Sequence, residues 1–274
     1  MLSAAIIVFR ETLEAALIIG IIAVATRNLR ARNAWLLGGI TAGLLGSVLV
    51  ALSTSKIADW AQGMGQELFN ASVLGVAAAM LAWHNIWMAR HGRQLAMQAK
   101  QLGHEVSTGS REMSALALVV GLAILREGSE TALFLYSMLT GGEETLSSVL
   151  GGGALGLILG CAAGLGLYAG VLRIPPRHFF GVTSGLILLL AAAMASQAAR
   201  FLVQADVLPS LAAPLWNTAW LLDNSSVLGR TLHTLVGYEA APSGTQVAFY
   251  AATLVSILIG MRLVRNRPLP ISTP

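Results

Sequence analysis

Seven apolar runs, each long enough to cross a bilayer, dominate this chain and limit what it can fold into. They cover about residues 2–26, 34–54, 68–89, 113–139, 148–171, 179–204 and 246–263. A transmembrane helix needs about 20 apolar residues, whereas a membrane β-strand needs only about 9 to 11 with alternating hydrophobicity. Only 11% of the 274 residues are charged, against about 25% in a soluble domain. The runs predict an all-α membrane protein with seven transmembrane helices and no soluble catalytic domain.

The basic residues predict how these helices are oriented. The formal net charge is +4, and most basic residues lie in connections on one side of the predicted bundle, after the first, third, fifth and seventh runs. Such a bias marks the cytoplasmic side, so we expect the N-terminus outside and a multi-pass protein in the cytoplasmic (inner) membrane. The first run starts at Leu2 with no basic residue ahead of it, which predicts a retained helix rather than a cleaved signal. The charge thus favours membrane lipid, and not nucleic acid, as a partner.

Two similar motifs suggest an internal repeat. RETLE (10–14) in the first run returns as REGSE (126–130) in the fourth, shifted by 116 positions, and small residues spaced by four mark the second and fifth runs. Three helices per copy would invert the second copy, as in many transporters. We therefore predict one membrane domain over 1–274. It contains a first repeat (1–111), an inverted second repeat (112–204), an outer loop with an interfacial helix (205–245), and a seventh helix with a cytoplasmic tail (246–274).

The charged residues of the two motifs lie near the middle of their runs. A charge at that depth costs at least about 2.5 to 3.5 kcal/mol, so the six residues are expected to face one another or water. Residues three or four apart share a helix face, which pairs the carboxylates within each motif and places each arginine near its second glutamate. Four carboxylates and two guanidiniums suit a hard multivalent cation. The candidate ligands are Glu11, Glu14, Glu127 and Glu130, with Arg10 and Arg126 as motif partners.

Other interpretations of the motifs stay open at this point. Each cluster could be a buried Arg–Glu pair that fixes helix packing in a structural membrane protein. A metal-dependent oxidoreductase inside the membrane is another alternative. Di-iron bundle enzymes use Glu-x-x-His, however, whereas three residues after the first glutamate these motifs have Glu14 and Glu130. Cys161 is the single cysteine, which excludes a clustered thiolate metal site.

At these residues the sequence resembles the oxidase-dependent iron permease family of bacteria and fungi. The resemblance rests on RETLE and REGSE, and extends to QELF (66–69) and GYEAAPS (237–243). It implies transport of Fe(III) or Fe(II) into the cytoplasm along Glu11, Glu14, Glu127 and Glu130. It also implies a periplasmic or extracellular partner that binds or oxidises iron. Fungal members carry further acidic motifs in outer loops, where this chain has only Glu143 and Glu144.

The remaining expectations concern substrate and entry. Iron is expected as the transported substrate, with no cofactor bound permanently and no enzymatic activity. Some relatives are associated with lead, so another heavy metal is the alternative cargo. Possible entry residues are Glu67 before the third run and Asp223 and Glu239 in the outer loop. We expect His84 to be a packing histidine near the inner end of the third run, with a role in iron exit as the alternative.

Overall fold

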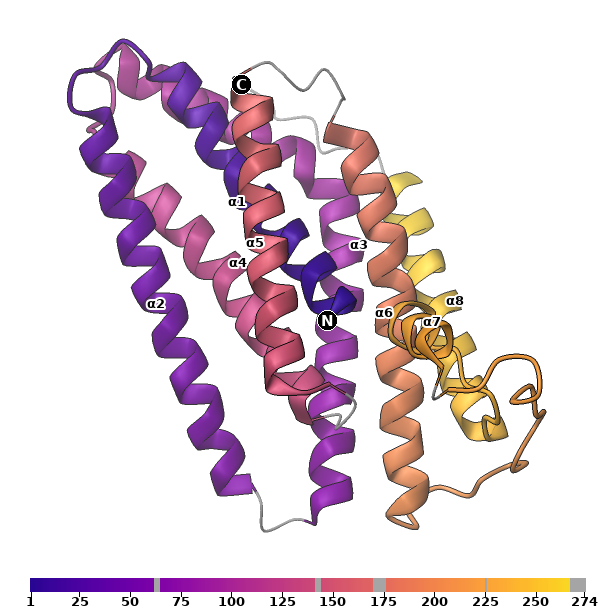
Figure 1. Cartoon of the computed structure of the whole chain (residues 1–274). Coiled ribbons are helices and arrows are strands. Elements are labelled where there is room, and N and C mark those ends of the chain that lie inside the picture. The colour runs from indigo at the N-terminus through magenta and orange to yellow at the C-terminus, as the bar shows by residue number, and fades with distance from the viewer. Residues whose placement is uncertain (62–64, 141–143, 170–175, 225, 267–274) are drawn as a thin grey trace. The chain divides into compact units, whose positions relative to one another are not determined.

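In a computed structural model the chain is helical, as the apolar runs predict. The structure describes residues 1–61, 65–140, 144–169, 176–224 and 226–266, and no strand occurs among them. The helices are α1 (Leu2–Ala25), α2 (Arg32–Ala61), α3 (Gln66–Ser107), α4 (Ser114–Thr140), α5 (Leu146–Tyr168), α6 (Pro176–Gln204), α7 (Val227–Val236) and α8 (Gly244–Asn266) (Figure 1). The all-α class is therefore confirmed, and a short helix, α7, lies in the predicted outer loop.

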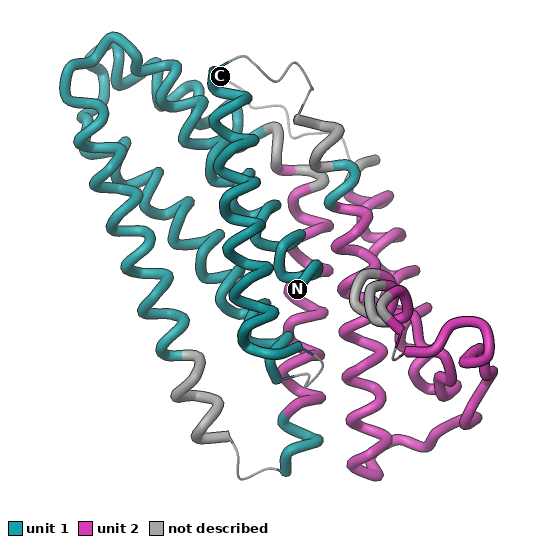
Figure 2. The backbone as a smooth tube through the Cα atoms, in the orientation of Figure 1, with its two compact units in different colours: residues 1–69, 94–183 teal, residues 70–93, 184–274 magenta. Residues whose placement is uncertain are grey.

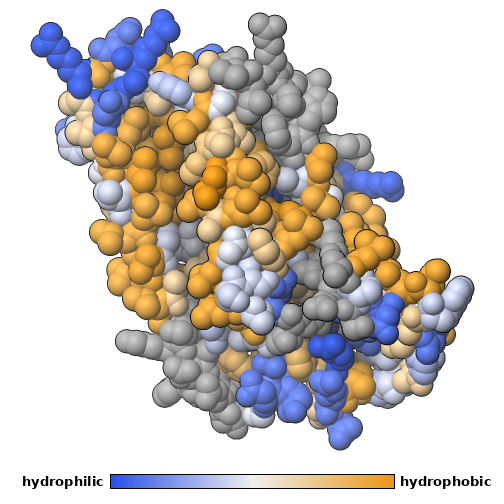
Figure 3. Space-filling view, viewed as in Figure 1, coloured by the Kyte–Doolittle hydropathy of each residue, from blue (hydrophilic) through white to orange (hydrophobic). Residues whose placement is uncertain are grey.

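Within the described part of the chain, five helices have the length and composition needed to cross a membrane: α2, α3, α5, α6 and α8. The helices α1 and α4 contain 24 and 27 residues, but each carries the three charged residues of its motif. Leucines that a soluble protein would bury are exposed along α2 and α5, including Leu45 (67% exposed) and Leu165 (67%). In Figure 3 the outer faces of these helices are hydrophobic, and hydrophilic residues gather near the α1–α2 and α3–α4 connections. Such surfaces are suited to lipid. The count of seven spans stays a prediction.

The chain divides into two compact units (Figure 2). Unit 1 consists of Met1–Phe69 and Gln94–Thr183, and therefore holds α1, α2, α4, α5 and both ends of α3. Unit 2 consists of Asn70–Arg93 and Ser184–Pro274, with the middle of α3, most of α6, and α7 and α8. These units are defined by packing, whereas the predicted repeats are defined by sequence. The division into two three-helix repeats stays a prediction.

Within unit 1, α5 packs closely on α1 through a stripe of buried glycines. The buried positions of α5 are Val149 and the four glycines Gly152, Gly156, Gly160 and Gly164. A Cβ atom added to Gly156 would lie 2.9 Å from the backbone nitrogen of Phe9, and one added to Gly160 would lie 2.7 Å from Cβ of Thr12. The missing side chains let the two backbones approach, which is how helices commonly associate in a bilayer.

The helix α2 packs on α4 in the same way. A Cβ atom added to Gly39 would lie 2.5 Å from the carbonyl oxygen of Ala117, and one added to Gly43 would lie 2.6 Å from that of Gly121. Ser47 continues the stripe, and its hydroxyl donates to the carbonyl oxygen of Gly43 (2.9 Å) within α2. Each of the two helices that carry the motifs thus packs closely against a partner helix whose facing residues are small.

Within unit 1, the C-terminal part of α3 packs against the end of α1 and the start of α4. We expect a polar continuation of the third helix over 90–112, and α3 does continue to Ser107. One face of this continuation is apolar, however: Ala99, Leu102 and Val106 are buried in a core with residues at the end of α1 and the start of α4. This packing places the α3–α4 connection beside the α1–α2 connection, and both connections carry basic residues.

Candidate metal site on α1 and α4

Each motif forms the same ion pair within its own helix. In α1, Nε of Arg10 lies 2.9 Å from Oε1 of Glu14. In α4, Nε of Arg126 lies 3.2 Å from Oε1 of Glu130. Both pairs join residues four apart, which occupy one helix face. The expectation that each arginine reaches the second glutamate of its motif is confirmed.

The crossing of α1 and α4 brings three carboxylates together. One oxygen each from Glu11, Glu127 and Glu130 lies within 4.8 Å of the others. We call these three residues the carboxylate cluster. Hard cations bind carboxylate oxygens at about 2.0 to 2.6 Å, so ligands of one ion can be about 4 to 5 Å apart. The observed spacing therefore suits a single hard cation. Three carboxylates so close repel one another unless a cation or a proton lies between them.

Burial strengthens the repulsion between these carboxylates, because little water is present to screen their charges. Glu11 is 1% exposed and Glu127 is 4% exposed. The arginines only partly compensate for the negative charge, because Arg10 and Arg126 contact the second glutamates of their motifs most closely, and Arg126 is 3.8 Å from Glu127. A cation in the cluster would supply the positive charge that two arginines leave missing beside four carboxylates. Together these contacts make the cluster a candidate cation site.

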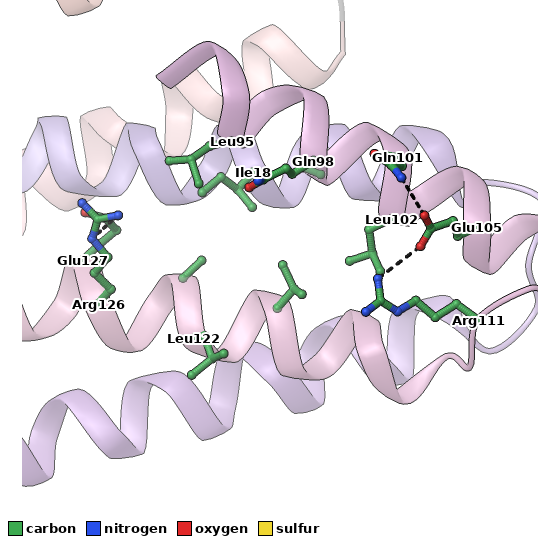
Figure 4. Close-up of a pocket in the computed structure, with 13 residues that line it drawn as sticks. Ile18, Leu95, Gln98, Gln101, Leu102, Glu105, Arg111, Leu122, Arg126 and Glu127 are labelled. Carbon is green, nitrogen blue, oxygen red and sulfur yellow. Dashed lines mark hydrogen bonds and ion pairs between the residues drawn. The ribbon is translucent and has the colours of Figure 1, made fainter. Parts of the chain in front are cut away.

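The two motifs differ in accessibility. The side chain of Arg10 is 1% exposed, whereas the side chain of Arg126 is 35% exposed. Arg126 and Glu127 line one end of a cavity of about 450 Å³ in unit 1 (Figure 4). The motif of α1 is therefore sealed by packing, while the motif of α4 is open to a space large enough for a hydrated ion.

The other candidate residues lie in different surroundings. Glu14 is buried (3% exposed) and held by Arg10, outside the carboxylate cluster. Glu67 is exposed in the first turn of α3, where a carboxylate interacts favourably with the helix dipole. In unit 2, His84 is buried at 3% exposure. The roles expected of these three residues stay predictions.

The acidic loop residues have local partners. In unit 2, Glu239 accepts a hydrogen bond from Asn224, and its Oε2 lies 3.6 Å from Nδ1 of His233. The backbone carbonyl of Asp223 accepts a hydrogen bond from the hydroxyl of Ser226 (2.7 Å). These contacts stabilise the loop around α7. In unit 1, Glu144 pairs with the N-terminal ammonium group, and Glu143 lies outside the described residues.

The sequence interpretation missed the polar residues of α3 that line the cavity. Gln98, Gln101 and Glu105 lie along it and come from the part of α3 that the sequence interpretation treats only as a polar extension. Their spacing of three and four residues is a recognisable helix-face signal. The three residues could therefore have been assigned to one face from the sequence, but not to a cavity that also contains Glu127.

Comparisons with known proteins find relatives over nearly the whole chain. A family model described as "Iron permease FTR1 family" matches residues 1–265. The chain is 30% identical over 264 residues to the ferrous iron permease EfeU of Escherichia coli O6:H1, covering 94% of each chain. It is 29% identical over 263 residues to EfeU of Shigella sonnei, and 27% identical over 259 residues to EfeU of Yersinia pestis. These matches cover 94% of both chains for the Shigella protein, and 93% of this chain and 90% of the relative for the Yersinia protein. No solved structure matches the chain.

Proposed function

The chain belongs to the iron permease FTR1 family, and on that premise we propose that it carries iron across the cytoplasmic membrane into the cell through the carboxylates of α1 and α4. It is a multi-pass membrane protein and a permease rather than an enzyme. The observation that carries the proposed path is the carboxylate cluster, in which oxygens from two helices lie within 4.8 Å of one another. In this proposal iron is the cargo and no cofactor is bound permanently.

The charge of the site explains why a cation would pause there. Arg10 and Arg126 pair most closely with Glu14 and Glu130. Their longer contacts with Glu11 (3.4 Å) and Glu127 (3.8 Å) compensate the charge of these two carboxylates less well, in a setting that excludes most water. A divalent ion replaces its hydration shell with these oxygens and offsets that charge. An inside-negative potential then favours entry by about 2.3 kcal/mol per charge per 100 mV, or about 5 kcal/mol for a divalent ion.

We further propose seven transmembrane helices built as two inverted repeats of three plus a final helix. Support comes from equivalent contacts at equivalent positions. Three residues, Met1 and two of α1, face glycines of α5 and are related by the shift of 116 positions to α4 residues that face α2. The pairs are Met1–Gly152 and Ala117–Gly39, Ala5–Gly156 and Gly121–Gly43, and Thr12–Gly160 and Gly128–Ser47. Chance similarity of two motifs would not reproduce this packing.

The oxidation state and the partner also belong to the proposal. The relatives are named ferrous iron permeases, and we propose Fe(II) as the ion that crosses the cluster in this chain. We expect a periplasmic or extracellular protein that binds or oxidises iron to supply the outer face. Glu67, Asp223 and Glu239 remain the proposed entry residues on that side.

The test is uptake of radioactive iron into proteoliposomes. Wild type is compared with Glu11→Gln, Glu127→Gln and Glu130→Gln, and with Glu112→Gln as a matched control, because Glu112 is an exposed glutamate outside the cluster. We expect saturable uptake that the cluster variants abolish and the control retains. Normal uptake by well-folded cluster variants would contradict the proposed path.

The same preparation separates the alternatives. Iron is supplied as Fe(II) and as chelated Fe(III), and Pb(II) is tested in parallel. Faster uptake of Fe(III) would correct the oxidation state, and faster uptake of Pb(II) would correct the substrate. Oxidation of Fe(II) by the purified protein without a partner would favour the oxidoreductase interpretation.

A further inference from the structure

The cavity in unit 1 connects the α4 motif to the end of the unit where the basic connections lie. It is enclosed by α1, α4 and the C-terminal part of α3, and its volume is about 450 Å³. Figure 4 shows Arg126 and Glu127 at one end and Glu105 and Arg111 at the other. Glu127 lies about 13 residues after the start of α4, which is about 20 Å along the helix at 1.5 Å per residue. The cavity therefore extends over a length of about half the thickness of a bilayer.

The walls between the two ends are mostly apolar. Ile18, Leu102, Val119 and Leu122 are among the side chains that line them. Among the described residues of the lining, the other polar side chains between the ends are Gln98 and Gln101, whose amide oxygens can serve a cation as neutral ligands. The carboxylates of the lining stand only at the ends, at Glu127 and Glu105. A cation that leaves the cluster along this cavity therefore meets its next negative charge at Glu105.

The end of α3 holds Glu105 in this position. The backbone carbonyl of Glu105 accepts hydrogen bonds from the backbone N–H groups of Ser110 (3.0 Å) and Arg111 (3.2 Å). Gly109, with φ of 77°, makes the left-handed turn that this helix end requires. The turn brings Arg111 back to the carboxylate, where its Nη1 lies 3.1 Å from Oε2 of Glu105. Nε2 of Gln101 donates to the other carboxylate oxygen at 2.8 Å.

This ion pair can open, unlike the pair of the α1 motif. The side chains of Glu105 and Arg111 are 31% and 57% exposed, whereas Arg10 and Glu14 are 1% and 2% exposed. Water competes with exposed ion pairs, so they contribute little to stability and separate easily. A cation arriving from the cavity can displace the guanidinium and bind the freed oxygens. Arg111 can later return to the carboxylate as the ion leaves.

From this arrangement, which rests on the proposed function, we propose that Glu105 is a further iron ligand, at the cytoplasmic end of the path. Gln101 orients its carboxylate, and Arg111 is the counter-ion that occupies it when no metal is bound. The ion passes from the carboxylate cluster, through the amide-lined cavity, to Glu105 and then to the cytoplasm.

The experiment compares the two partners of the ion pair in the proteoliposome assay with Fe(II). The variants are Glu105→Gln, Glu105→Asp and Arg111→Gln, with Glu112→Gln as the matched control. We expect Glu105→Gln to lower the maximal rate at least fivefold with less than a twofold change in KM, because entry on the outer side is untouched. Glu105→Asp keeps a carboxylate and should recover most of the rate. Arg111→Gln should lower it by no more than half.

A purely structural ion pair predicts a different pattern, since either substitution breaks the same contact. Equal losses in Glu105→Gln and Arg111→Gln, or no loss in either, would overturn the proposal. Loss of uptake in Glu130→Gln, measured in the same preparation, shows that the proposed function holds whatever the outcome at Glu105. If Glu105→Gln folds poorly, the other two variants decide the question. Most of the wild-type rate in Glu105→Asp and at least half of it in Arg111→Gln support the proposal, and a larger loss in Arg111→Gln overturns it.

An independent measurement tests where the cavity opens. In a Cys161→Ser background, Ala123→Cys places a thiol on the cavity wall. We expect a membrane-impermeant thiol reagent to label it from the cytoplasmic side. Labelling from the outer side alone would overturn the assignment of Glu105 to the exit.

Discussion

Substitution of Arg10 should destabilise the protein far more than the same substitution of Arg126, although the two arginines hold the same position in their motifs. Both make an ion pair with the glutamate four residues later, at 2.9 and 3.2 Å. The difference lies in solvent access, because the Arg10 side chain is 1% exposed and the Arg126 side chain is 35% exposed. Arg10→Gln leaves a buried glutamate without its guanidinium, whereas water can solvate the glutamate that Arg126→Gln leaves.

The expected magnitudes follow from these exposures. Breaking a buried pair by removing one partner costs about 3 to 5 kcal/mol, and an exposed pair contributes about 0 to 1 kcal/mol. One kcal/mol lowers the Tm of a chain of 150 to 250 residues by about 2 to 4 °C. We therefore expect Arg10→Gln to lower Tm by roughly 6 to 20 °C, and Arg126→Gln by at most about 4 °C.

Thermal unfolding of the purified variants in one detergent, without added metal, measures this difference. The double variant Arg10→Gln, Glu14→Gln removes both charges, so it should regain much of the stability lost by Arg10→Gln alone. Equal losses for the two single arginine variants would refute the reasoning from burial. A double variant no more stable than Arg10→Gln would show that Arg10 acts through contacts other than Glu14.

Three further predictions use the same preparations. Gly156→Ala should destabilise the protein by about 1 to 3 kcal/mol, because the added methyl group forces α5 away from α1. Its control is Gly151→Ala, which has open space at its Cβ position and should be neutral or stabilising by up to about 1 kcal/mol. A Tm for Gly156→Ala at or above that of wild type would contradict the close packing. Divalent metal at about 100 times its Kd should raise the free energy of unfolding of wild type by about 2.7 kcal/mol, and Glu127→Gln should lose this effect in the same thermal assay. Glu239→Ala removes the contacts with Asn224 and His233 and should lower stability by about 1 kcal/mol. Because Glu239 is a proposed entry residue, this variant should also raise the KM for iron while uptake at saturating iron stays within twofold, and an unchanged KM would argue against its role in entry.

Local features of the site were predictable because helix geometry alone determines them. The spacing of four residues places Arg10 beside Glu14 and Arg126 beside Glu130 in any helix, and the structure has both pairs. The apolar runs predict the helices because each run is long enough to form a transmembrane helix. The continuation of α3 was also predicted as a helix, but as a polar one. The spacing of Ala99, Leu102 and Val106 shows that one of its faces is suited to burial.

Features that depend on how helices cross were not predictable. Glu14 and Glu130 are equivalent in sequence, yet Glu130 belongs to the carboxylate cluster and Glu14 does not. The crossing angle and rotation of α1 and α4 decide this, and they result from contacts along the whole length of both helices. The cavity beside Glu127 has the same origin, since it depends on where the end of α3 packs.

The unequal surroundings of the two motifs bear directly on how a permease avoids a leak. In the proposed inverted arrangement, the two copies present the same charged residues to the membrane from opposite directions. In unit 1 the motif of α4 opens to a cavity through Arg126 and Glu127, while the motif of α1 is closed by packing. If both were open, the potential that favours iron entry would also drive other cations through the carboxylates. A cluster shared by one open and one sealed motif can bind an ion from one side and hold it without forming a continuous pore.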